Sequence, residues 1–173
     1  DSHGVIPVTR TPTLRRAYFD CRFGQLHVHL AIPPGGGFEE ATTLLCIPDA
    51  PGSGRYFGPL LASLGADRSV YAVDVPGGGE SDPPPAGAGP LQLAAALKDF
   101  LDNMRIRRVD LLGCGQGAAI ALAMAQQYPS IVGRVALSPD DDAVHQLARQ
   151  AGHPVRVFGP AAGGLPTVAD GAL

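Results

Sequence analysis

The sequence lacks the features that mark several classes of protein. Its net charge of −3 leaves no basic surplus for binding nucleic acid or an anionic membrane. No apolar run approaches the roughly 20 residues that cross a bilayer. The cysteines, Cys21, Cys46 and Cys114, are too few and too scattered for a disulfide framework or a CxxC zinc site. We therefore expect a cytoplasmic protein with no nucleic-acid partner, no membrane segment and no cofactor.

The length of 173 residues suits one domain spanning residues 1–173. The chain opens with DSHG, without Met and without the apolar core of a signal peptide. We expect these first residues to be an added remnant or the start of a fragment.

Alternating apolar segments define the expected fold. Residues 16–32 are typical of a β-hairpin, and from residue 43 onward strands alternate with helices. Strands are expected at 43–47, 69–75, 109–112, 134–138 and 154–158, with helices near 56–64, 93–104, 116–128 and 140–151. This order predicts an α/β fold: a doubly wound, mostly parallel sheet with helices on both faces and an antiparallel hairpin at one edge. Residues 159–173 show little pattern and are expected to be an irregular tail.

The stretch VDLLGCGQGAAI (109–120) predicts a strand, a glycine-rich turn and a helix. Gly113, Gly115 and Ala118 fit the dinucleotide fingerprint G-x-G-x-x-(G/A), with Asp140 placed where an acid could meet a ribose. Gly113 and Gly117 fit equally the outer positions of a nucleophile elbow, where a strand and a helix pack too closely for a Cβ. At least two strand–helix units precede this turn, which favours the elbow.

Three stretches resemble the α/β-hydrolase family, the group that includes epoxide hydrolases, haloalkane dehalogenases and small esterases. LLCIPDAPGSGRYFGPLLASL resembles its first buried strand and oxyanion loop, YAVDVPGGGESDPPP its D-x-P-G-x-G-x-S-D loop, and VDLLGCGQGAAIALAMAQQYP its elbow and helix. The resemblance implies a shortened, α/β-hydrolase-like domain. We expect no cap domain, because only a short predicted helix separates Ser138 from Pro154.

The catalytic groups that this resemblance implies are missing. Relatives carry Ser, Asp or Cys at the elbow apex, where this chain has Gly115, which has no attacking atom. In the oxyanion loop, Asp49 and Ala50 replace the family's His-Gly, and a carboxylate at Asp49 opposes a developing oxyanion. No residue matches the family's base, since His145 falls within a predicted helix and His153 precedes its strand.

Two displaced residues are weak catalytic candidates. Cys114 is next to the apex, but we expect its side chain to point into the core, where a thiol is unreactive. Asp140 follows the strand at 134–138 and could be a triad acid, although an acid in the first turn of a helix explains it as well.

Several polar residues have structural explanations. His27 and His29 share one face of a strand and could form a two-ligand metal site, but no third ligand is evident, so we expect an open hairpin face and no metal. Asp74, Ser81 and Asp82 are expected to fix their loop by turn hydrogen bonds.

Three functions remain open. The first is a non-catalytic or binding member of the hydrolase family. The second is an active hydrolase of small esters that uses displaced residues, and the third is a dinucleotide-binding module built on Gly113-x-Gly115. Any small-molecule ligand is expected at the carboxyl ends of the parallel strands. A shortened sheet could expose an edge or an apolar face where the final strand and helix would have packed, and a homodimer could cover it.

Overall fold

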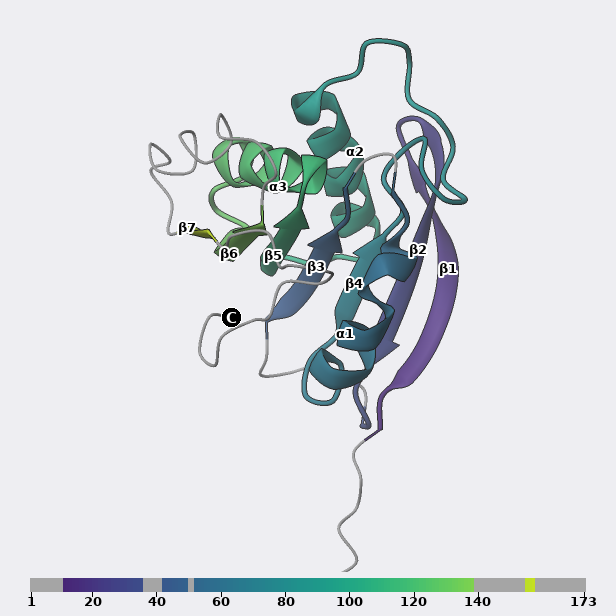
Figure 1. Ribbon diagram of the computed structural model, residues 1–173, viewed down its shortest axis with the longest axis vertical. Helices are drawn as coiled ribbons and strands as arrows, with labels where there is room; N and C mark the ends of the chain where they lie inside the picture. The colour runs from purple at the N-terminus through teal and green to yellow at the C-terminus, as the bar shows by residue number, and fades with distance from the viewer. Residues whose placement is uncertain (1–10, 36–41, 50–51, 139–154, 158–173) are drawn as a thin grey trace, which may run out of the picture.

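The computed structural model describes residues 11–35, 42–49, 52–138 and 155–157. These residues form one sheet with helices on its two faces (Figure 1). Its strands are β1 Thr13–Cys21, β2 Gly24–Ile32, β3 Thr43–Ile47, β4 Val70–Val73, β5 Val109–Cys114, β6 Val132–Ser138 and β7 Val155–Val157. The helices are the 3₁₀ turn η1 Gly54–Phe57, then α1 Gly58–Leu64, α2 Pro90–Asn103 and α3 Gln116–Gln127.

The sheet has seven strands in the order β1-β2-β4-β3-β5-β6-β7. The β1–β2 and β2–β4 pairs are antiparallel, and the remaining pairs are parallel. This confirms the predicted mostly parallel sheet with an antiparallel hairpin at its edge. Of the two hairpin strands, only β1 lies at the edge of the sheet, because β2 lies between β1 and β4. The predicted helix at 140–151 and the irregular tail lie outside the described residues.

Each face of the sheet has its own apolar core. One face packs against α2 and α3 and includes Leu26, Val28 and the fully buried Phe100. The other packs against η1 and α1, with Phe57 and Cys46 in its core. Burying a phenylalanine of this kind contributes about 1.5–3 kcal/mol, so both helix layers hold the sheet firmly.

The parallel strands are apolar throughout because the sheet is covered on both faces. Every residue of β5 is buried, as a central strand covered on both faces requires. At the end of β5 the chain turns sharply into α3, whose apolar residues are buried on the side of the larger core. The carboxyl ends of β3, β4, β5 and β6 therefore lie along one edge of the sheet, where the expected site should be.

Candidate functional site

The turn between β5 and α3 has the backbone of a nucleophile elbow. Gly115 lies at its apex with φ +54° and ψ −126°, a conformation that glycine adopts far more readily than other residues. The N–H of Gly115 donates to the Ser138 carbonyl at 2.8 Å, and the Gly115 carbonyl accepts from the N–H of Ala118 at 3.0 Å. These bonds fix the apex between β6 and the first turn of α3.

The two outer glycines are required by close backbone packing. A Cβ on Gly113 would lie 2.6 Å from the Gly117 carbonyl oxygen and 2.8 Å from the Ala118 Cα. A Cβ on Gly117 would collide with the carbonyl oxygens of Ile47 and Pro48. The prediction that strand and helix pack too closely here for side chains is confirmed.

The apex faces a carboxylate rather than a substrate-sized space. A Cβ on Gly115 would lie 2.5 Å from Asp49 Cγ and 2.6 Å from its Oδ1. The same Oδ1 accepts a hydrogen bond from the backbone N–H of Gln116 at 2.7 Å. Asp49 therefore fills the space that an apex side chain would need.

This contact has a direct consequence for hydrolase chemistry. In α/β hydrolases the N–H of the residue after the nucleophile is one donor of the oxyanion hole. The corresponding N–H here, that of Gln116, already donates to a negative charge. An oxyanion would have to displace this carboxylate and would be repelled by it. Ala50, the other predicted residue of the oxyanion loop, lies outside the described residues.

The displaced catalytic candidates gain no support from the described residues. Cys114 is 6% exposed and belongs to the apolar core on the η1–α1 face of the sheet, as predicted for a side chain that points into packing. Asp140, His145 and His153 lie outside the described residues. The two described histidines belong to β2, which is separated from β5 by β4 and β3.

A second polar cluster lies beside the end of β4, around Asp74. This carboxylate is 1% exposed and accepts hydrogen bonds from Ser53 Oγ at 2.7 Å, from the Gly54 N–H at 2.7 Å and from the Glu80 N–H at 3.0 Å. Its Oδ2 also lies 2.8 Å from His27 Nδ1. Since an ionised carboxylate only accepts, Nδ1 carries the proton in this pair.

These hydrogen bonds control the ionisation of Asp74. Burial by itself raises the pKa of Asp74, but the bonds from Glu80, Ser53, His27 and Gly54 outweigh it and hold the pKa below its usual value. Asp74 is therefore ionised at neutral pH, although it is buried.

The loop that follows β4 is fixed in the predicted way. Ser81 Oγ donates to the Asp74 carbonyl at 2.7 Å and accepts from the His27 N–H at 2.8 Å. Asp82 Oδ2 accepts from the Gln25 N–H at 2.7 Å. The predicted structural role of Asp74, Ser81 and Asp82 is confirmed.

The expectation of an open histidine face is wrong. His27 is 2% exposed and His29 is 9% exposed, because Asp74, η1 and the loop after β4 cover this part of β2. The third potential ligand that seemed missing is Asp74, since one donor atom from each of His27, His29 and Asp74 lies within 4.8 Å of the others. The alternation in LHVHL placed both histidines on one face, but nothing local indicated that β4 would pair beside them.

The cluster contains the residue types of a catalytic triad: Ser53, Asp74 and the two histidines. Their hydrogen bonds, however, do not run in the order serine to histidine to aspartate. Asp74 accepts from both Ser53 and His27, so neither contact makes an imidazole the base for the Ser53 hydroxyl. This arrangement anchors the loops and does not activate a nucleophile.

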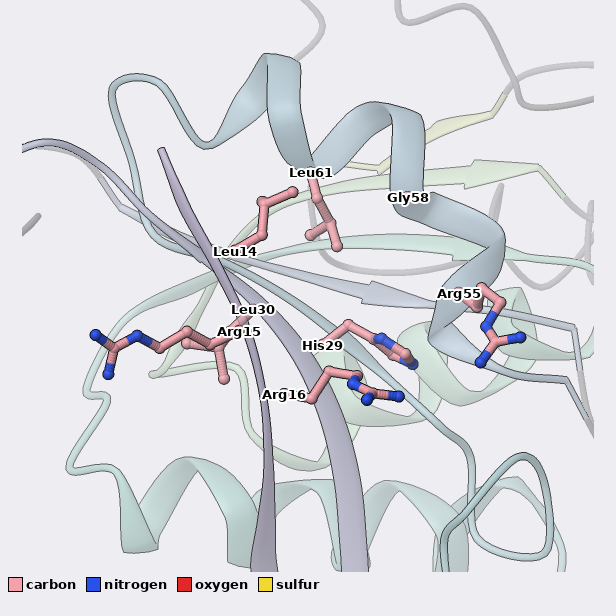
Figure 2. Close-up of a pocket in the computed structure, with 8 residues that line it drawn as sticks. All are labelled: Leu14, Arg15, Arg16, His29, Leu30, Arg55, Gly58 and Leu61. Atoms are coloured by element: carbon pink, nitrogen blue, oxygen red, sulfur yellow. The ribbon is translucent and has the colours of Figure 1, made fainter. Parts of the chain in front are cut away.

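A groove runs beside this cluster, between β1 and the η1–α1 segment. It encloses about 450 Å³ and is lined by Leu14, Arg16, Arg55 and Leu61, among other residues, with His29 at its base (Figure 2). A smaller cavity of about 280 Å³ is lined by Ser53, Arg55 and Glu80 together with the two histidines and Asp74. His29 lines both spaces.

Residues 42–156 match the alpha/beta hydrolase fold family. The chain is 31% identical over 133 residues to a 2-hydroxy-6-oxononadienedioate/2-hydroxy-6-oxononatrienedioate hydrolase of Paraburkholderia phymatum, covering 75% of this chain and 46% of the relative. A hydrolase of the same name from a Pseudomonas species is 25% identical and covers 69% of this chain and 43% of the relative. The chain thus spans just under half the length of these relatives.

Solved structures agree with this fold. The naproxen esterase of Bacillus subtilis superposes with a TM-score of 0.66 at 27% identity, covering 75% of this chain and 45% of the esterase. An epoxide hydrolase gives the same TM-score at 17% identity, covering 73% of this chain and 43% of that protein, which supports the fold alone. Within the described residues, no helix has the length and apolar character needed to cross a membrane.

Proposed function

Because the chain belongs to the alpha/beta hydrolase fold family, we propose that it is a member in which the elbow no longer catalyses hydrolysis and the carboxyl edge of the sheet binds a small molecule instead. One observation carries the loss of hydrolysis. The Asp49 carboxylate accepts from the Gln116 N–H at 2.7 Å while it occupies the space beside Gly115. The nucleophile and a free oxyanion donor are therefore missing from the same turn.

Both losses affect the same chemical step. Covalent hydrolysis needs an attacking atom at the apex and donors aimed at the charge that develops on the substrate carbonyl. Removing one such donor from an active enzyme costs about 10²–10³ in kcat. Here that donor faces a negative charge and the attacking atom is also missing, so hydrolysis through this turn should be undetectable.

Turnover of short-chain p-nitrophenyl esters tests the proposal. We expect the purified protein to release p-nitrophenol no faster than a heat-denatured sample, with the B. subtilis naproxen esterase as the positive control. Turnover above the denatured sample that is lost in Cys114→Ala or Asp140→Asn would establish the alternative, an active hydrolase with displaced residues.

The dinucleotide alternative has a separate test. A pyrophosphate at this turn would use the N–H groups that open α3, and the Asp49 carboxylate beside the Gln116 N–H repels it. We expect NAD, NADP and FAD to leave the thermal unfolding midpoint unchanged. Saturating binding at 100 times Kd would add about 2.7 kcal/mol of stability, which such a screen detects easily.

We also propose that the chain can self-associate through its edge strand β1. Leu14 and Tyr18 of the edge strand β1 are 56% and 50% exposed, which supports a surface that a second copy could cover. Sedimentation equilibrium of the wild-type chain and of Leu14→Ser tests this, since a dimer through β1 should weaken in the variant.

A further inference from the structure

The cluster of His27, His29 and Asp74 contains an unexplained atom. His29 Nε2 is buried and has no hydrogen-bond partner among the described residues. Leaving a polar atom in this state is costly, and native proteins rarely do so without a ligand or a functional reason. Asp74 Oδ1 lies 3.3 Å from it, at ion-pair distance.

We infer that His27, His29 and Asp74 form a binding site for a divalent transition-metal ion of the zinc type. Imidazole nitrogens with one carboxylate are a frequent ligand set for zinc. The site is distinct from the elbow, and the inference does not depend on the proposed function.

The distances within the cluster suit such an ion. Two ligand atoms held about 2.0–2.1 Å from a tetrahedral zinc lie about 3.3–3.4 Å apart. The separation of His29 Nε2 and Asp74 Oδ1 is 3.3 Å. One donor atom from each of the three residues lies within 4.8 Å of the others, so metal binding requires the cluster to contract. The ion must also replace a hydrogen bond that Asp74 accepts, and His27 must present a nitrogen without its proton.

The surroundings could complete the coordination. Glu80 Oε2 lies 3.8 Å from His27 Nε2 and can approach from the solvent side, because its side chain is 54% exposed. The adjacent cavity of about 280 Å³ has room for a water molecule or a small ligand. Three protein ligands beside an open position are typical of zinc sites that bind a further group.

One neighbouring charge opposes a cation here. Arg16 pairs with His29 across β1 and β2, and its guanidinium lies beside the imidazole (Figure 2). The charge of Arg16 must therefore weaken metal binding, which gives the test a second, independent readout.

Titration calorimetry of the full chain with ZnCl₂ and with MgCl₂ tests the inference. We expect one zinc ion per chain and no magnesium binding, because magnesium prefers oxygen ligands. His29→Gln should raise the zinc Kd at least tenfold. The matched control His145→Gln/His153→Gln removes two other histidines and should leave the Kd unchanged. Failure of the wild type to bind zinc, or equal Kd values for His29→Gln and the wild type, would overturn the inference.

Two further measurements decide the outcome even if His29→Gln does not fold. Arg16→Gln, at an exposed position, should lower the zinc Kd several-fold, whereas Arg107→Gln in the exposed loop before β5 should not. A cobalt complex of the wild type should show d–d bands of low coordination without a thiolate charge-transfer band. A thiolate band would assign the metal to a cysteine, and an unchanged Kd in Arg16→Gln would place it elsewhere; either result refutes the site.

Discussion

The Asp49 carboxylate and the Gln116 backbone N–H form a 2.7 Å hydrogen bond beneath the apex of the β5–α3 turn. The bond joins the loop after β3 to the first residue of α3 and takes the place that a substrate oxygen would occupy in an active relative. A glycine at position 115 makes it possible, since a Cβ there would overlap the Asp49 side chain. The two departures from the family pattern, Gly115 and Asp49, are thus one structural unit.

The first prediction concerns this unit. Gly115→Ala should destabilise the protein by more than Gly87→Ala, because both residues have positive φ but only Gly115 faces Asp49, while Gly87 has open space. Backbone strain at positive φ costs an alanine about 1–3 kcal/mol, and it need not be equal at the two positions, because Gly115 has ψ −126°. Urea unfolding of both variants gives the comparison.

A double variant tests whether the contact with Asp49 causes the extra loss of stability in Gly115→Ala. In an Asp49→Gly background the extra cost of Gly115→Ala should disappear, giving a coupling free energy of about 0.5–3 kcal/mol. Equal costs for Gly115→Ala and Gly87→Ala in the wild-type background would contradict the contact.

Gly117→Ala provides the second prediction. The new Cβ would meet two backbone carbonyl oxygens, those of Ile47 and Pro48, which cannot move without shifting β3. We expect a loss of about 2 kcal/mol or more in the free energy of unfolding, despite the better helix propensity of alanine. A neutral Gly117→Ala would argue against the close packing of β3 on α3.

Most of the fold could be predicted from the sequence because its signals are local. Continuous apolar runs fixed the positions of β3 and β5, and a strand period of two placed Leu26, Val28 and Leu30 in the core. Helix α2 starts earlier than its apolar stripe suggested, at Pro90, since the Gly89 N–H donates to the Gln92 side chain at 2.9 Å. Such boundary contacts leave little trace in hydrophobic periodicity.

The site was predictable only in part, for a reason of sheet order. The missing nucleophile at Gly115 is visible in one letter of the sequence. The histidine cluster depends on β2 pairing with β4, which brings His27 beside Asp74, 47 residues away in the chain. A hairpin can join either edge of a sheet, and neither composition nor spacing determines which strand will be its neighbour.

Cysteine reactivity gives the third prediction. Burial raises the pKa of Cys21 and of Cys46, and Cys46 and Cys114 are both buried in the core beneath α1. Native protein should react with iodoacetamide first at the half-buried Cys21, and roughly tenfold or more slowly at the other two. Peptide mass spectrometry after timed labelling measures this, with urea-unfolded protein as the control. Fast labelling of native Cys114 would revive it as a nucleophile.

The last prediction concerns the ion pair that ties the β1–β2 turn to α2. Arg22 donates from Nε and its backbone N–H to Asp99 Oδ2, and from Nη2 to Oδ1, at 2.8–3.0 Å. These bonds hold the pKa of Asp99 below its usual value, chiefly through the guanidinium.

The sign of the pH dependence follows from that lowered pKa. A carboxyl group whose pKa is depressed by folding stabilises the native state above its unfolded pKa of about 3.9, and this contribution is lost as the pH falls through the folded value. Since the Arg22 and Asp99 side chains are 49% and 26% exposed, solvent screening limits the contribution to about 0.5–1 kcal/mol. Asp99→Asn should therefore be less stable than the wild type at pH 7 in urea unfolding, and the difference should shrink markedly by pH 3. The exposed Asp67→Asn, which loses no such pair, should match the wild type at both pH values. A gap between Asp99→Asn and the wild type that is undiminished at pH 3 would mean that packing, rather than the ion pair, accounts for the effect.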